Sequence, residues 1–273
     1  MSLHNLAADK TVICNIPCLL NYETYVRTGV HGDGSCFLHA FLRATKPSYK
    51  YKSYNERVER VKELRAQIAD LVDDQSLKAI GNGEPRRMLF FQHLGTLVKD
   101  GFPGDAPPGV ILNQLMNLSL VLEETTTFAS NFYAVFLDKI KERCCVTIPE
   151  ATYEAKFEKF VRGWCYEQFL RANRDMLAEY KRVLLEEQIG SLEVEFIARA
   201  VHVNFLFLRE KKGRIEPYRT GAEIINPEWP CLVILWINDS HYELVGRLEE
   251  DRTVARTFTS DDEIIRKLLD DQR

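Results

Sequence analysis

The sequence predicts an α+β fold, because its helical patterns come first and its strand-like segments gather late in the chain. Up to residue 190, apolar residues recur at spacings of three and four, which is typical of amphipathic helices. Beyond residue 190, β-branched and aromatic residues form short runs joined by hairpin-like turns. This order favours α+β over a doubly wound sheet, and 273 residues suffice to bury a sizeable core.

Residues 29–44 combine a glycine turn with a dense apolar run. We expect residues 1–28 to form a lead-in that packs beside the helix that follows. Residues 31–34 (HGDG) predict a tight polar turn, since glycine supplies positive φ angles and aspartate bonds local backbone amides. Residues 37–42 (FLHAFL) are almost entirely apolar and hold no helix breaker, so Cys36 is expected in the first turn of a buried helix.

The position of Cys36 suits a nucleophile. Free backbone amides and the positive end of the helix dipole stabilise a thiolate, which lowers the thiol pKa from its usual value near ~8.5. The same amides can hydrogen-bond an oxygen that lies next to the sulfur, as an oxyanion hole requires. The alternative is a small buried hydrophobic residue, the commonest role of a free cysteine, and this stretch alone leaves both interpretations open.

The middle of the chain is predicted to be helical. A polar loop is expected at 45–52, and an amphipathic helix over about 54–73. The helical pattern at 150–188 is too long for one globular helix, so we expect a bend near Gly163 or Asn173.

The sequence is interpreted as one domain spanning residues 1–273 with a helical insertion or lobe at about 75–188. Residues 100–109 hold three prolines and three glycines, which indicates either a mobile loop or the edge of that lobe. The end of the chain, 257–273, is expected to be a charged, flexible helical tail.

Residues after 190 supply the predicted sheet. A helix is expected from Ser191, as its N-cap, through Val201. Strands are expected at residues 203–207, 214–218, 231–237 and 241–247. The aliphatic run 231–237 is long enough for a buried central strand, and an Asn-Asp-Ser turn connects it to the last strand.

Composition excludes several classes of function. The net charge is −4 with 36 basic and 40 acidic residues, and no basic stripe appears, so nucleic acid is not an expected partner. The seven cysteines include no CxxC pair and no histidine at zinc-ligand spacing, so neither a metal nor another cofactor is expected. Residues 1–10 lack signal-peptide character, and the longest apolar run is too short for a bilayer. We expect a soluble cytoplasmic monomer without a membrane partner.

A nucleophilic thiol needs a base, and His241 is the candidate among six histidines. It starts a strand directly after the Asn-Asp-Ser turn, beside the expected central strand. Side chains alternate along a strand, so Glu243 shares the face of His241 and its carboxylate can reach the imidazole. A satisfied surface histidine in a hairpin is the alternative.

Taken together, DGSCF at a helix start, LEVEFIARAV before a strand, and a strand followed by HYE resemble the ovarian-tumour (OTU) family of cysteine proteases, most of which are deubiquitinases. The resemblance covers 29–44 and 190–247, and residues 46–188 carry no motif that matches. It implies a papain-like fold with a small, central, mostly antiparallel sheet flanked by helices, here with an enlarged helical region.

The resemblance makes Cys36 the nucleophile and His241 the general base. The orienting third residue is either Glu243 or Asp33, and family members more often carry aspartate or asparagine where this chain has Glu243. Asp33 is otherwise expected to shape the loop. The implied oxyanion donors are the backbone amides of Gly34, Ser35 and Cys36.

The implied substrate is ubiquitin, a polyubiquitin chain or a ubiquitin-like modifier, cut at the isopeptide bond of its C-terminal glycine. The arginine-bearing tail of ubiquitin calls for aromatic or acidic walls, for which Tyr242, Trp236 and Glu228 are candidates. Each can equally be a core aromatic or a solvated acid. Two other hypotheses stay open: a weakly catalytic or non-catalytic ubiquitin-binding module, and a cysteine protease for another modifier.

Overall fold

The computed structural model describes residues 4–20, 22–83, 86, 89, 90, 92, 93, 170–211, 213–219 and 225–270. The chain divides into two compact units, one of Met1–Val72 with Lys181–Arg273 and the other of Asp73–Tyr180. The bounds of the second unit lie close to those of the expected insertion at 75–188. The predicted break at 100–109 lies outside the described residues.

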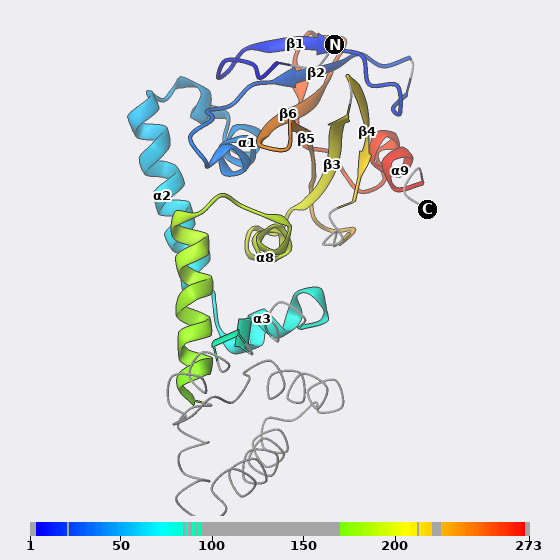
Figure 1. Cartoon of the computed structure of the whole chain (residues 1–273). Helices are drawn as coiled ribbons and strands as arrows, with labels where there is room; N and C mark the ends of the chain where they lie inside the picture. The colour runs from blue at the N-terminus through cyan, green and yellow to red at the C-terminus, as the bar shows by residue number, and fades with distance from the viewer. Residues whose placement is uncertain are drawn as a thin grey trace, which may run out of the picture. The chain divides into compact units, whose positions relative to one another are not determined.

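The first unit is built on a seven-stranded sheet with strand order β1-β2-β6-β5-β3-β4, and β7 pairs with β6 (Figure 1). Its strands are β1 (Thr11–Cys14), β2 (Tyr25–Thr28), β3 (Asn204–Lys211), β4 (Arg214–Tyr218), β5 (Cys231–Ile237), β6 (His241–Leu248) and β7 (Val254–Ala255). All neighbouring strands are antiparallel except β3 and β5. This mixed sheet with flanking helices is compatible with the α+β prediction, and β5 has the central place expected of it, between β3 and β6.

Residues 1–28, expected as a lead-in to α1, contain the strands β1 and β2, which were not predicted and which extend the sheet beyond β6. Each strand has only four residues, too few to show an alternating pattern in the sequence. Strand β2 pairs with β6, whose Gly246 lies opposite Val26, and β1 pairs in turn with β2. Long-range pairing of this kind leaves no local signal.

Helices cover both faces of the sheet. Helices α1 (Cys36–Thr45) and α8 (Ser191–Val201) lie on one face and α9 (Glu263–Asp270) on the other (Figure 1). Under α1, the ring of Phe37 packs against Phe205 and Tyr242 at centroid distances of 4.8 and 5.6 Å. The tail expected to be flexible instead buries the apolar side of α9 in the core with β5, because Ile264, Ile265 and Leu268 are fully covered.

Other predicted elements are confirmed with shifted ends. Helix α2 (Tyr54–Asp70) stops short of residue 73, since Asp73 caps the next helix, α3 (Asp74–Ala79), by accepting from the Ser76 amide. The expected loop at 45–52 contains a 3₁₀ helix, η1 (Pro47–Tyr51). A helix runs through residues 170–186 without a break at Asn173, and residue 163 lies outside the described part.

The predicted cap of α8 was wrong by one residue. Gly190 is the N-cap of α8, and Ser191 is the first residue of the helix. The carboxylate of Glu193 accepts a hydrogen bond of 2.9 Å from the Gly190 amide, so a side chain inside the helix satisfies this free donor.

Candidate active site

Cys36 is the first residue of α1, as predicted, and only 2% of it is exposed. Burial raises the pKa of its thiol above the ordinary value, and hydrogen bonds from the backbone amides of Tyr242, Phe37 and Cys36 offset this only in part. The expected lowering of the thiol pKa therefore does not hold for the free protein, because desolvation outweighs the helix terminus.

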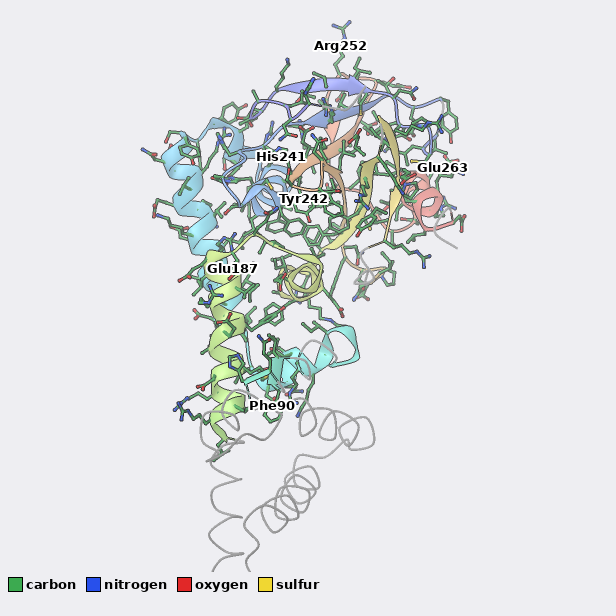
Figure 2. All side chains as sticks on the ribbon, viewed as in Figure 1. Phe90, Glu187, His241, Tyr242, Arg252 and Glu263 are labelled. Carbon is green, nitrogen blue, oxygen red and sulfur yellow. The ribbon has the colours of Figure 1, made fainter. Side chains whose placement is uncertain are left out.

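His241 is the first residue of β6 and lies beside α1 (Figure 2). The turn before it has left-handed backbone angles at Asn238 (φ 51°) and Asp239 (φ 55°), the conformation of a tight two-residue hairpin turn. His241 is 4% exposed, and burial lowers the pKa of its imidazole. Its Nε2 atom is buried and has no hydrogen-bond partner among the residues that the structure describes.

Two contacts bring these segments together from opposite ends of the sequence. The ring of Phe37, the residue after Cys36, packs against the ring of Tyr242, the residue after His241, at a centroid distance of 5.6 Å. The imidazole of His241 lies against Gly32, where an added Cβ would be 3.6 Å from Nδ1. The histidine therefore packs against the glycine turn that leads into the nucleophile helix.

Asp33 is engaged with groups other than His241. Its carboxylate accepts hydrogen bonds from Nε2 of His39 at 2.9 Å and from the amide of Ser35 at 3.1 Å, and the Tyr54 hydroxyl lies at 3.4 Å. Burial alone would raise the pKa of Asp33, but the hydrogen bond and charge of His39 lower it overall. Nδ1 of His39 hydrogen-bonds the hydroxyl of Tyr49, so a chain of hydrogen bonds runs from the exposed Asp33 to the buried His39 and Tyr49.

Glu243 is fully buried on the same side of β6 as His241. Its carboxylate accepts a 2.6 Å hydrogen bond from the Leu6 amide and lies 3.5 Å from Nη1 of Arg27. Burial raises its pKa, and the Leu6 amide and Arg27 counteract this. These contacts tie residues 4–6 to the sheet, since Nη2 of Arg27 also donates to the carbonyl of His4.

The predicted oxyanion donors differ in backbone conformation and in hydrogen bonding. Gly34 has φ +83°, which only glycine adopts without strain, and the place of its missing Cβ faces open space. The Ser35 amide already donates to Asp33. The amides of Gly34 and Cys36 are therefore the better placed donors for an oxyanion.

The candidate substrate walls are not gathered at one place. Tyr242 is 8% exposed and packs against Phe37, so it belongs to the core. Trp236 is half-buried beside it, with the guanidinium of Arg209 4.8 Å from its ring. Glu228 is exposed but precedes β5, whereas His241 pairs with Ile237 at the other end of that strand, about 20 Å away at the rise of a strand.

Sequence reasoning missed the side chains that hold the two segments. Neither His39 nor Arg209 was singled out from the sequence, although the guanidinium of Arg209 donates to Asp239 in the histidine turn at 2.7 Å. The available signal for His39 was its position three residues after Cys36, because residues at this spacing are neighbours on the surface of a helix. The Arg209–Asp239 pair joins β3 to a distant turn and has no local signal.

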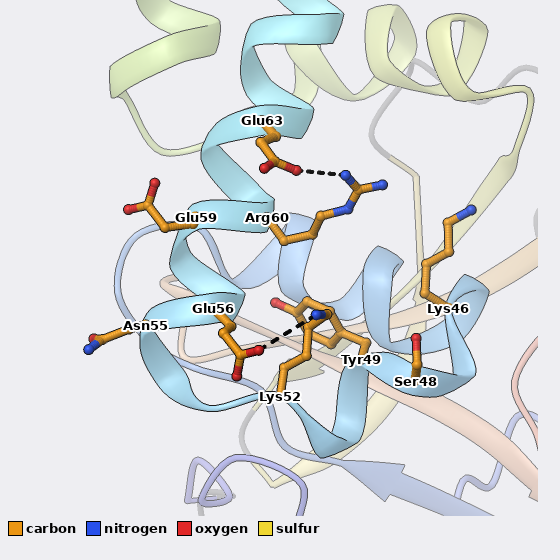
Figure 3. Close-up of a pocket in the computed structure, with 9 residues that line it drawn as sticks. All are labelled: Lys46, Ser48, Tyr49, Lys52, Asn55, Glu56, Glu59, Arg60 and Glu63. Carbon is orange, nitrogen blue, oxygen red and sulfur yellow. Dashed lines mark hydrogen bonds and ion pairs between the residues drawn. The ribbon is translucent and has the colours of Figure 1, made fainter.

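Two hollows lie near the nucleophile helix. A cavity of about 310 Å³ is lined by the oxyanion loop (Asp33, Gly34 and Ser35) together with α2 and residues 185–188. A larger groove of about 640 Å³ runs along η1 and α2 (Figure 3). Its charged walls are paired with one another, Arg60 with Glu63 and Lys52 with Glu56, so the groove offers few unpaired groups to a ligand.

Within the described residues, no group of three or more His, Cys, Asp or Glu side chains could hold a metal ion. None of the helices in that part of the chain has the length and apolar character that a membrane crossing needs. No protein-family model matches the chain, and a comparison with curated proteins gives no significant match. Function has to be inferred from the chemistry of the site.

Proposed function

We propose that the protein is a thiol-dependent deubiquitinase of the OTU type, which hydrolyses isopeptide bonds at the C-terminal glycine of ubiquitin or a ubiquitin-like modifier. The observation that carries the proposal is the packing of the His241–Tyr242 segment against the glycine turn and the first residues of α1, the helix that begins at Cys36. A thiol, an imidazole with a free buried nitrogen and two loop amides are the groups that acyl transfer requires. The mostly antiparallel sheet is compatible with the papain-like fold of that family.

In this mechanism, His241 takes the proton of Cys36, and the thiolate attacks the carbonyl carbon of the terminal glycine. The amides of Gly34 and Cys36 stabilise the oxyanion of the tetrahedral intermediate. The imidazolium of His241 then gives its proton to the departing lysine amine, which leaves a thioester on Cys36. Finally, His241 removes a proton from water, which attacks the thioester and releases the glycine carboxylate.

The free site holds both groups uncharged, because burial raises the pKa of Cys36 and lowers that of His241. Binding of the extended tail would then have to bring the pair into its charged state. We further propose that the protein acts as a cytoplasmic monomer on ubiquitin or its chains without a cofactor, and that Trp236 forms a wall for the tail.

The test is to incubate the protein with ubiquitin that carries a C-terminal electrophile and to measure the intact mass. A single adduct is expected for the natural chain and for Cys14→Ala, a partly exposed free thiol elsewhere in the sheet, but none for Cys36→Ala. An adduct only with another modifier would keep the chemistry and change the substrate. No adduct with any modifier would favour a binding module over an enzyme.

A further inference from the structure

A chain of hydrogen bonds connects the residue before the nucleophile to the residue before the histidine. It starts at Arg65 of α2, which is 5% exposed. Its Nη2 atom donates to the hydroxyl of Ser35 at 3.2 Å and to the carbonyl of Glu187 at 2.8 Å. Its Nη1 atom donates to the carbonyl of Leu184 at the end of the helix through 170–186. One guanidinium thus fixes the start of α1 to the segment after that helix.

The next residue of that segment completes the connection. Nε2 of Gln188 donates a 3.2 Å hydrogen bond to the carbonyl of Ser240, which directly precedes His241. Gln188 also lines the cavity of about 310 Å³ together with Gly34, Ser35 and Arg65. Residues 187–188 are therefore linked to Ser35 through Arg65 and to the histidine turn directly through Gln188.

We propose that Arg65 and Gln188 are positioning residues that set the distance between Cys36 and His241. This rests on the proposed function, in which the two groups exchange a proton, and adds to it the side chains that hold them in register. Proton transfer depends steeply on such a distance, because a misplacement of about 1 Å can cost about a hundredfold in rate. The two backbone segments come from different elements, so a cross-connection is needed to fix their spacing.

The residue types suit this role. Arginine presents up to five donors in a rigid plane, and Arg65 uses that fork to reach three acceptors on two elements. A lysine keeps the charge but not the fork. Gln188 is exposed, so loss of its hydrogen bond is expected to loosen the histidine turn without unfolding the protein.

The test compares two variants with two matched controls. Gln188→Met keeps the length of the side chain and removes its donor, and Arg65→Lys removes the fork. The controls are Gln75→Met, an exposed glutamine of α3, and Arg60→Lys, a partly exposed residue of α2 that pairs with Glu63. For each protein, kcat and KM are measured on ubiquitin with a fluorogenic C-terminal amide, together with the NMR titration of the His241 ring, which His241→Gln identifies.

We expect Gln188→Met to lower kcat about three- to tenfold with little change in KM, as loss of one hydrogen bond would. Arg65→Lys is expected to lower kcat further, and both variants should shift the His241 titration. The two controls should leave kcat and the titration unchanged. If the natural protein is active but Gln188→Met has an unchanged or raised kcat and an unchanged His241 titration, the positioning role is wrong. The proposed function is then unaffected. If the natural protein has no activity on ubiquitin but the His241 titration still shifts in Gln188→Met, the proposed function is wrong. The positioning role of Gln188 is then unaffected.

Discussion

Two buried histidines flank Cys36, and their surroundings differ. His39 of α1 has both ring nitrogens paired, Nε2 with the carboxylate of Asp33 and Nδ1 with the hydroxyl of Tyr49. His241 of β6 has a buried Nε2 without a partner. Burial is the first cause that lowers the pKa of both rings, so they differ in hydrogen bonding rather than in the direction of their titration.

In the proposed mechanism, this difference separates the histidine that stabilises the structure from the one that transfers protons. A neutral His39 satisfies its neighbours with a single tautomer, in which Nε2–H donates to Asp33 and the Tyr49 hydroxyl donates to Nδ1. An unpaired buried nitrogen is rare in folded proteins, and a catalytic role is one of the reasons for which it is retained. His241 therefore has an unused acceptor or donor, and His39 has none.

The largest expected effect is on activity, in His241→Gln. Loss of the proton acceptor and donor together should lower kcat/KM on a ubiquitin substrate by at least about a thousandfold. The melting temperature should stay close to that of the natural chain, because the replaced Nε2 has no hydrogen bond to lose. Activity within tenfold of the natural chain would remove His241 from the mechanism.

His39→Leu is expected to show the reverse pattern. The change leaves Asp33 and Tyr49 without their buried partner, which should cost about 2–4 kcal/mol of unfolding free energy in urea denaturation. Activity measured well below the melting temperature should fall less than in His241→Gln, since His39 does not touch the substrate in the proposed mechanism. A stable His39→Leu without activity would contradict the separation of roles.

A smaller effect is expected in the pH dependence of stability. Both histidines have a lower pKa in the folded chain than the ordinary 6.5, so the unfolded chain binds more protons below that pH. The contribution of the two histidines to the unfolding free energy should therefore be complete above pH 7 and decrease as the pH drops below 6.5. Around His39, the nearby charge of Asp33 opposes this shift, and those of His31 and Arg57 add to it.

Urea denaturation between pH 7.5 and pH 5 checks this, with His241→Gln expected to flatten the slope. Asp33 acts in a lower range, because its lowered pKa contributes stability that is lost only as the pH falls below about 4. A slope that is unchanged in His241→Gln would show that its imidazole is not desolvated in solution.

The sequence contained the local part of this site and not the long-range part. The start of α1 at Cys36 and the strand that begins at His241 follow from a glycine turn, an apolar run and an Asn-Asp-Ser turn, which act over a few residues. The partners of Glu243 could not be predicted, because they depend on β2 and residues 4–6 folding over β6. The raised pKa of the thiol was missed for the same reason, since burial is a property of the assembled core.

The smallest effect is expected for Glu243→Gln, which tests whether this carboxylate orients His241 or anchors residues 4–6. Glutamine keeps the shape and an acceptor for the Leu6 amide but removes the charge opposite Arg27, which should cost about 1 kcal/mol of unfolding free energy. Because the hydrogen bond of Glu243 goes to Leu6, kcat/KM of Glu243→Gln should fall less than tenfold. The decrease in kcat/KM should be larger in Asp33→Asn, which disturbs the turn before Cys36. A loss of a hundredfold or more in Glu243→Gln alone, with the unfolding free energy unchanged, would make Glu243 the residue that orients His241.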